Sequence, residues 1–243
     1  MPLTLSSFSL ADMIRCGAAV RASCLGATSM EDAAHRVVRQ LFDDLYGSGS
    51  DAECVLARFY LTVPYAELDG SRQAFAKRLL GDAPWAELPC LTLLASAGVT
   101  AEWNDPALSR AHRAIPLPSP ATVAQSPMIA ALISQLGLEL SALLSPDPDL
   151  MVDLDQKQYN VFHVADAIGS PYVPAQDDFV VPYGVQSVVG FGGMLPSGEM
   201  FAVVLFSRAP ISRETADLFR TVALNVKVAV LPVVGRTFAA TPP

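Results

Sequence analysis

Aromatic and basic side chains recur where this 243-residue sequence could bind a small molecule. Arg58 and Tyr60 alternate with apolar residues along an extended stretch, and more aromatic residues and a histidine flank a loop in the second half of the chain. Ligand pockets are mostly apolar with a few placed polar groups, and this mixture fits that description. The residues expected to line a pocket are Arg58, Tyr60, Tyr159, Phe162, His163, Tyr172, Phe179 and Tyr183. The alternative is that the aromatic residues fill the core beneath a long loop.

The sequence lacks the common motifs of catalysis. It has no Gly-x-Ser-x-Gly elbow, no His-Glu-x-x-His pair, no phosphate loop with lysine and no Cys-x-x-Cys. The run Gly190-Phe-Gly-Gly193 is similar to a dinucleotide fingerprint, but it lies within a strand ahead of a hairpin and not at a strand-to-helix turn. We therefore expect a protein that is not an enzyme. These glycines are expected to let another backbone or a ligand approach the strand closely.

Residues that could bind a metal have weak patterns. His35 is expected on the polar side of a helix and His112 in a solvent-facing loop, whereas a structural role is favoured over a ligand contact for His163. A cluster of four aspartates lacks the glycine and terminal glutamate of a calcium loop, which favours a solvated surface. Its members are Asp147, Asp149, Asp153 and Asp155. No metal site is expected.

The cysteines indicate a reducing compartment. No basic segment precedes an apolar run at the N-terminus, so no secretory signal is expected and a cytoplasmic location is favoured. All four cysteines should then be thiols that pack as small hydrophobic residues. They are Cys16, Cys24, Cys54 and Cys90. A redox switch between Cys16 and Cys24 is the alternative.

Composition excludes other broad classes. Hydrophobic residues make up 51% of the chain and charged residues only 16%, so most of it must be packed. The net charge of −8 and the absence of a basic run argue against a nucleic-acid surface. The apolar stretch 222–234 is interrupted by Asn225, Lys227 and Pro232, which argues against a membrane span.

Hydrophobic periodicity predicts the elements that position these side chains. Helices are expected at 10–25, 29–46, 71–80, 126–144 and 212–230, and strands at 54–63, 90–97, 113–117, 158–164, 185–194 and 200–207. Alternation along 54–63 gives a core face with Val55 and Phe59, and a second face with Arg58 and Tyr60 that is typical of a cavity wall. Residues 165–178 form a long irregular loop.

The order of these elements favours one α+β domain. Neighbouring hairpins indicate an antiparallel sheet with helices segregated by face, and the N- and C-terminal helices are expected to pack together. The expected divisions are an N-terminal helix at 1–27, the main domain at 28–235 and a flexible tail at 236–243.

Several segments resemble a known family. The strand Val185-Gln-Ser-Val-Val-Gly-Phe191, its hairpin and the Pro-led closing helix resemble the end of a GAF domain, and Cys90-Leu-Thr-Leu-Leu-Ala-Ser-Ala-Gly98 resembles the second strand of that family. Other segments resemble the GAF-like regions that precede PAS and histidine-kinase modules in bacterial signalling proteins. These are Ser9-Leu-Ala-Asp-Met-Ile-Arg-Cys16, Tyr159-Asn-Val-Phe162, Gly169-Ser-Pro-Tyr172 and Phe191-Gly-Gly-Met-Leu-Pro-Ser-Gly198.

This resemblance implies a six-stranded antiparallel sheet, a pocket on one sheet face and a sensory role in signal transduction. The expected partners are a small-molecule ligand, a histidine kinase or other signalling protein, and a second copy of the chain. The cyclic-nucleotide and bilin signatures of the family are absent, so the ligand or cofactor stays open. The alternative function is a dimerisation or scaffold domain with an unoccupied pocket.

The expected homodimer rests on the first and last helices. Met13, Ile14 and Ala18 give the first helix an apolar surface, and Leu218 and Val228 lie away from the main apolar stripe of the last helix. Two such helices from each chain could form a four-helix bundle. The competing account is that the first helix packs on its own chain.

Overall fold

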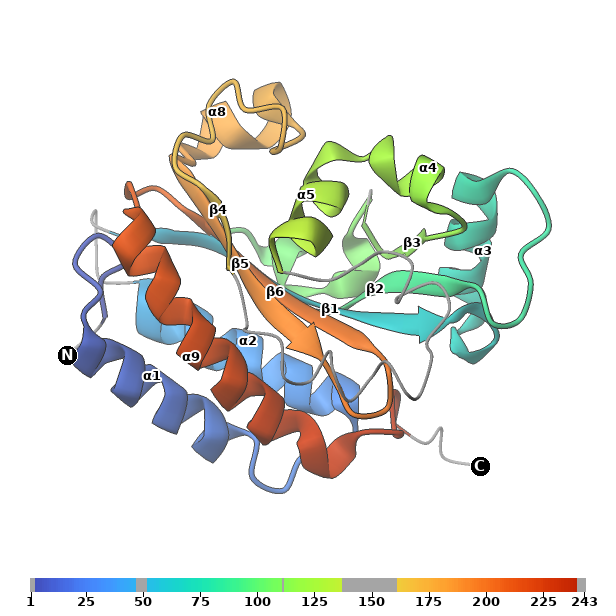
Figure 1. Cartoon of the computed structure of the whole chain (residues 1–243), viewed down its shortest axis with the longest axis horizontal. Coiled ribbons are helices and arrows are strands. Elements are labelled where there is room, and N and C mark those ends of the chain that lie inside the picture. Colours follow the sequence, from blue (N-terminus) through green and yellow to red (C-terminus); the bar gives the residue numbers. More distant parts are fainter. Residues whose placement is uncertain (1–2, 47–51, 111, 137–160, 240–243) are drawn as a thin grey trace.

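The computed structural model describes residues 3–46, 52–110, 112–136 and 161–239. A six-stranded antiparallel sheet runs through its centre in the order β3-β2-β1-β6-β5-β4 (Figure 1). Its strands are β1 (Cys54–Pro64), β2 (Pro89–Gly98), β3 (Ala114–Pro116), β4 (Val161–Val164), β5 (Ser187–Met194) and β6 (Met200–Ser207). The expected α+β class and antiparallel sheet are confirmed.

Three long helices cover one face of the sheet. They are α1 (Leu10–Ser23), α2 (Met30–Tyr46) and α9 (Arg213–Val230), and they lie together below the sheet in Figure 1. Helix α1 packs along α9, and the contact is close because Gly17 has no side chain. A Cβ at Gly17 would lie 2.6 Å from Nδ2 of Asn225. The expected packing of the N- and C-terminal helices is confirmed, and it takes place within one chain.

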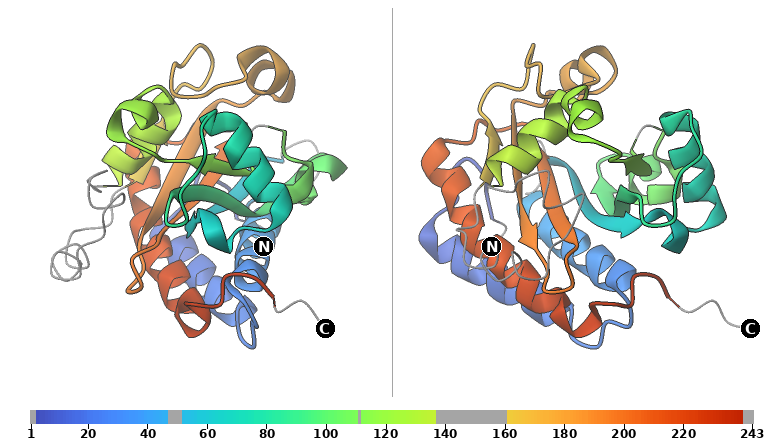
Figure 2. Two further views of the ribbon diagram at one scale, coloured as in Figure 1. Left: turned by 90° about the vertical axis from the view of Figure 1, so that its right-hand side faces the viewer. Right: turned by 45° about the vertical axis from the view of Figure 1, so that its right-hand side comes forward.

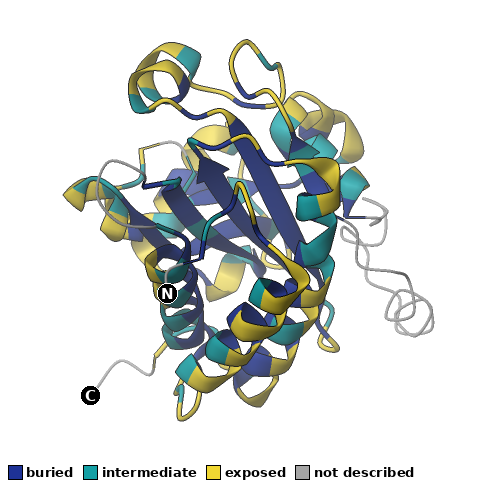
Figure 3. Ribbon diagram, turned by 90° about the vertical axis from the view of Figure 1, so that its left-hand side faces the viewer, coloured by how far each residue is buried: buried dark blue, intermediate teal, exposed yellow. Residues whose placement is uncertain are grey.

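Shorter elements cover the opposite face. Helices α4 (Pro120–Ala124) and α5 (Pro127–Gln135) lie above the sheet (Figure 2). A long loop also lies there, and it ends in a π-helical turn, Gln176–Val180, followed directly by α8 (Val181–Tyr183). Helix α3 (Gly70–Leu80) lies beside β3 at the sheet edge, and single turns of 3-10 helix occur at Tyr65–Glu67, Ala101–Asn104, Pro106–Leu108 and Leu231–Val233. Because both faces are covered, the strands are almost entirely buried (Figure 3).

Side-chain caps begin the long helices where the sequence predicts them. Ser9 and Asp12 form a reciprocal capping box on α1, and the Ser212 hydroxyl accepts from the amide of Thr215 at the start of α9. The Ser29 hydroxyl likewise accepts from the amide of Asp32. These contacts satisfy amides that a helix leaves unpaired at its N-terminus.

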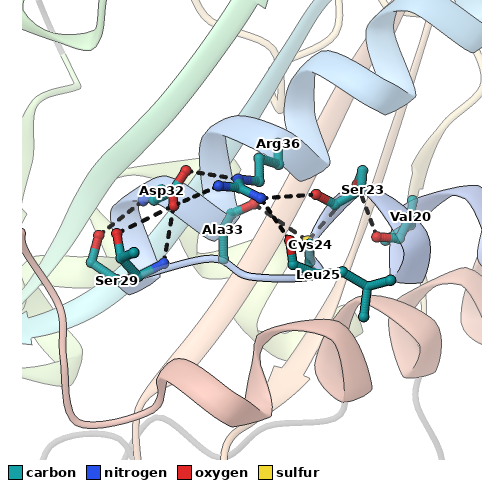
Figure 4. A network of polar contacts seen from close by, with 9 residues as sticks. Val20, Ser23, Cys24, Leu25, Ser29, Asp32, Ala33 and Arg36 are labelled. Atoms are coloured by element: carbon teal, nitrogen blue, oxygen red, sulfur yellow. Dashed lines mark hydrogen bonds and ion pairs between the residues drawn. The ribbon is translucent and has the colours of Figure 1, made fainter.

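Arg36 ties the end of α1 to the start of α2 (Figure 4). Its guanidinium donates to both carboxylate oxygens of Asp32, at 2.8 and 3.0 Å, and to the carbonyl oxygen of Leu25 at 2.9 Å. The hydrogen bond from Arg36 is the main cause of a lowered pKa at Asp32. The first helix is therefore part of the folded unit.

Two glycines of β5 allow close packing, as expected. A Cβ at Gly192 would lie 2.1 Å from the carbonyl oxygen of Phe201 on β6, and a Cβ at Gly190 would lie 2.8 Å from Leu132 of α5. A backbone thus approaches one glycine and a helix side chain the other. Neither contact has the strand-to-helix setting of a dinucleotide site.

The cysteines are four buried free thiols, which confirms their expected packing role. Burial raises the pKa of Cys16, Cys54 and Cys90 to about 12 and also raises that of Cys24. Thiols of this kind are poor nucleophiles at neutral pH.

Some expectations lie outside the described residues: Tyr159, the four-aspartate cluster and the continuation of the helix beyond residue 136. The domain boundaries stay predictions. Residues 236 and 237 are in contact with the rest of the fold, since the carbonyls of Arg236 and Thr237 accept from the amides of Met30 and Glu31. No helix among the described residues is long and apolar enough to cross a membrane.

Candidate functional site

A cavity of about 580 Å³ lies on the sheet face opposite α1, α2 and α9. Its floor comes from β1, β2 and β6, and its walls come from residues 100–110, His112 and residues 174–183 together with Met128 of α5. This size is typical of small-molecule sites. The lining residues that matter below are Arg58, Tyr60, Ser96, Thr100, Trp103, His112, Phe179 and Tyr183.

An irregularity in the sheet places Ser96 beside Arg58. The β1–β2 register shifts between Phe59 and Tyr60, and Leu94 and Ala95 both pack into the core on the helix side. Since side chains alternate along a strand, this extra residue moves Ser96 to the cavity face. Arg58 and Ser96 are direct cross-strand partners, and directly opposite residues share a face.

Three cavity residues carry buried polar atoms that lack a partner. Within the described part of the chain, no hydrogen bond is made by Nε of Arg58, Oγ of Ser96 or Oγ1 of Thr100. Ser96 is 5% exposed. Leaving such atoms unsatisfied costs about 1–3 kcal/mol each, so three of them on the lining of one cavity need a physical reason.

Arg58 also lacks an ion pair among the described residues. Its remaining contacts are long: one terminal nitrogen lies 3.4 Å from the Tyr60 hydroxyl and 3.5 Å from Nδ1 of His112. A charged group partly removed from water normally has a counter-charge. The Arg58 guanidinium therefore has capacity for an anionic partner.

His112 is neutral in this environment. Burial, and secondarily the positive charge of Arg58, lowers the pKa of His112 from 6.5 to about 4. The expected solvent-facing position of His112 is wrong, because His112 is half-buried and lines the cavity. His35 lies on the exposed side of α2, as expected.

Aromatic rings form the wall opposite the sheet. The Trp103 ring centroid lies 4.5 Å from that of Tyr183 and 5.3 Å from that of Phe179, and Phe179 packs edge-on against Phe206 of β6 at 5.1 Å. Gly98 makes room for this cluster, since a Cβ there would lie 2.8 Å from the Trp103 ring. The rings give the cavity an apolar surface suited to a flat group.

Side-chain hydrogen bonds fix both segments that carry these rings. Asn104 accepts from the amide of Gly98 and donates to the carbonyls of Gly98 and Thr100, which holds the turn bearing Trp103. Gln176 accepts from the amide of Gly169 and donates to the carbonyls of Ala167 and Val173, which closes the long loop on itself. The cavity walls are thus built by ordered loops.

The structure brings together half of the residues predicted for the pocket. Arg58, Tyr60, Phe179 and Tyr183 line the cavity.

The other predicted pocket residues lie elsewhere. Phe162 is fully buried in the core on the cavity side of the sheet, and Tyr172 is 44% exposed. His163 is on the strand position that faces the α9 side, where its Nε2 lies 2.8 Å from the carbonyl oxygen of Ile211. This contact agrees with the structural role favoured for it. Tyr159 lies outside the described residues.

Among the lining residues named above, Ser96, Thr100, Trp103 and His112 escaped the prediction from sequence. One signal in the sequence could have indicated Thr100 and Trp103: they directly follow the expected strand 90–97. The neighbouring strand 54–63 was expected to form a cavity wall. No group of three or more metal-ligating side chains is present among the residues that the structure describes.

Comparisons with known proteins find likenesses of fold. No family model and no curated protein sequence matches the chain. The GAF domain of Acinetobacter phosphoenolpyruvate-protein phosphotransferase is 14% identical, with 89% of this chain and 91% of that chain covered and a TM-score of 0.45. The phycoerythrobilin-bound GAF domain of a cyanobacterial phytochrome is 9% identical over 90% and 94% of the two chains, with a TM-score of 0.41.

A third similar structure is the chromophore-binding domain of a bacteriophytochrome from R. palustris. It is 10% identical, with 92% of this chain and 62% of that chain covered and a TM-score of 0.40. These identities leave the ligand of the present cavity to be argued from its own residues.

Proposed function

We propose that this chain is a GAF-like sensory domain that binds a small molecule in the cavity above β1, β2 and β6. The observation that carries the proposal is the set of unpartnered polar atoms on Arg58, Ser96 and Thr100 inside one cavity. A fold without a ligand gains nothing from three such atoms, whereas a ligand that pairs with them offsets their cost. The domain is non-catalytic.

In this proposal, occupancy is passed to a signalling partner such as a histidine kinase. A ligand that contacts both the sheet and the aromatic wall stabilises the loop arrangement around Trp103 and Tyr183. Binding shifts a conformational equilibrium only through such differential contacts. The partner then recognises the stabilised arrangement.

A search for a copurifying compound tests this function. The protein is denatured, the released small molecules are identified by mass spectrometry, and the chain is refolded without them. Because a ligand stabilises the state that binds it, the refolded protein should melt at a lower temperature, and the released fraction should restore the original value. Identical melting of native and refolded protein, with no compound released, would contradict the sensor and favour a scaffold.

A second function, self-association, has its own support. The outer surfaces of α1 and α9 expose Leu10 and Ile14, at 61% and 62%, and Leu224 and Val228, at 47% and 46%. Spacings of four residues place each pair on one side of its helix. We propose that a second copy covers these side chains, so that the two α1–α9 pairs form a four-helix bundle.

A further inference from the structure

We propose that the cavity takes a small monocarboxylic acid with a flat apolar body, and that Arg58 and Ser96 hold its carboxylate. This inference rests on the proposed ligand-binding function and assigns the chemical class of the ligand. It follows from the charge, the hydrogen-bonding capacity and the shape of the cavity.

The strand floor of the cavity provides one positive charge and, on the residue directly opposite it, one hydroxyl. Arg58 is the cationic residue on the strand floor, and a guanidinium binds a carboxylate through parallel hydrogen bonds. The Ser96 hydroxyl, which has no partner in the described structure, can donate to a remaining carboxylate lone pair. His112 adds a neutral imidazole, not a second cation.

The outer rim has the opposite electrostatic character. Three exposed carboxylates, Glu102, Asp105 and Asp178, line it with one exposed arginine, Arg110. A ligand with a second anionic group near the entrance would be repelled. A ligand with a single negative charge directed toward Arg58 therefore suits the site better than a phosphate dianion or a dicarboxylate.

The aromatic wall selects the body of the ligand. Trp103, Phe179 and Tyr183 are close enough to form one continuous apolar surface. Flat rings stack on such a surface with more gain than their buried area alone supplies. An arene or a similar planar group joined to the carboxylate fits this wall.

Isothermal titration calorimetry of the refolded protein with phenylacetate, phenylacetamide and phenyl phosphate tests the charge preference. Because a hydrogen bond to a charged group contributes more than a neutral one, the acid should bind about tenfold or more tightly than the amide. The phosphate should bind less tightly than the acid.

Arg58→Gln should abolish the preference for the acid, and Ser96→Ala should weaken acid binding about threefold or more. Arg21→Gln, at an exposed position of α1 outside the cavity lining, is the matched control and should change affinity less than twofold. Circular dichroism verifies that each variant is folded.

Fractionation of a cell extract separates failure of this assignment from failure of the sensor. The extract is passed over an anion-exchange resin at pH 8, and each fraction is tested for raising the melting temperature of the refolded protein. Activity in a retained monoanionic fraction supports the acid. Activity only in the unretained fraction, or equal affinity for phenylacetamide and phenylacetate, overturns the acid and leaves ligand binding intact. Absence of activity from every fraction and of binding by every probe overturns both.

Discussion

Arg58 on β1 and Ser96 on β2 are direct partners in the antiparallel register, and each carries a buried polar atom without a hydrogen-bond partner in the described structure. A cross-strand pair of this kind is costly in an empty protein. Because the pair lies on the cavity floor, a ligand bound there could supply the missing hydrogen-bond partners.

Removing the Arg58 charge should stabilise the ligand-free protein. Arg58→Met keeps a long apolar stem and deletes an unpaired guanidinium, so we expect the free energy of unfolding to rise by about 1 kcal/mol. The matched variant is Arg208→Met, because Arg208 donates to the carbonyls of Tyr183 and Ala52 at 2.9 and 3.1 Å. That variant should lose about 1–3 kcal/mol. Urea denaturation measures both, and destabilisation of equal size would be inconsistent with an unpaired Arg58.

His112 should make stability depend on pH between 6.5 and 5. Its pKa is about 4 in the folded state against an ordinary 6.5, so the unfolded chain binds more protons in this window. The contribution of neutral His112 to the free energy of unfolding is fully present above pH 6.5 and is lost as pH falls toward 4. The loss between pH 6.5 and 5 should be about 1.5 kcal/mol.

His112→Gln should flatten that pH dependence. Burial also lowers the pKa of His163, so the double variant with His163→Gln should be flatter still. Urea midpoints across the window provide the measurement. An unchanged slope in His112→Gln would show that His112 does not contribute.

Gly192 should be intolerant of a side chain. Because its added Cβ would lie 2.1 Å from a β6 carbonyl oxygen, Gly192→Ala must displace backbone and should cost about 2 kcal/mol or more. Gly70→Ala is the control, since nothing lies within 4 Å of a Cβ there and the residue begins α3. Thermal melts of the two variants compare them directly, and equal stability would refute the close approach.

The cysteines should be unreactive until the chain unfolds. We expect four thiol labels per chain after denaturation and almost none in the native state, because all four are buried with raised pKa values. Intact mass reports the number of labels. Two missing labels that return on reduction would indicate a disulfide.

Charge on the exposed α1 and α9 surfaces should separate the proposed dimer. Ile14→Glu combined with Val228→Glu should yield folded monomers by light scattering, because a bundle interface cannot bury the added carboxylates. Leu79→Glu, at an exposed position of α3 away from both helices, should leave the dimer intact. A wild-type mass of one chain across micromolar concentrations would exclude the bundle.

Strand and helix positions could be predicted from the sequence because their signals are local. Ser9, Ser29 and Ser212 began helices as expected, and alternation along β1 placed Arg58 and Tyr60 on the cavity side. Side chains alternate between the two faces of the sheet along the part of β1 that contains Arg58 and Tyr60. A register shift beside Cys54 changed the facing only at the strand start.

The rest of the site depended on information that a single strand does not contain. Ser96 reaches the cavity because of a bulge against β1, and Trp103 reaches it because Asn104 folds the following turn back onto Gly98. His163 was one position away from the cavity face, which was enough to put it on the other side of the sheet. Strand pairing and loop closure therefore decide which of these side chains reach the cavity.

Tryptophan fluorescence tests the central claim, that the cavity binds a small molecule, most directly. Trp103 lies in the cavity wall, whereas Trp85 is 48% exposed and is not part of the lining. The refolded Trp85→Phe variant, in which Trp103 is the only tryptophan, is titrated with the small molecules released from the native protein. The account predicts a saturable change in its emission and no change in the matched Trp103→Phe variant. Constant emission from Trp103, or the same change in both variants, would contradict it.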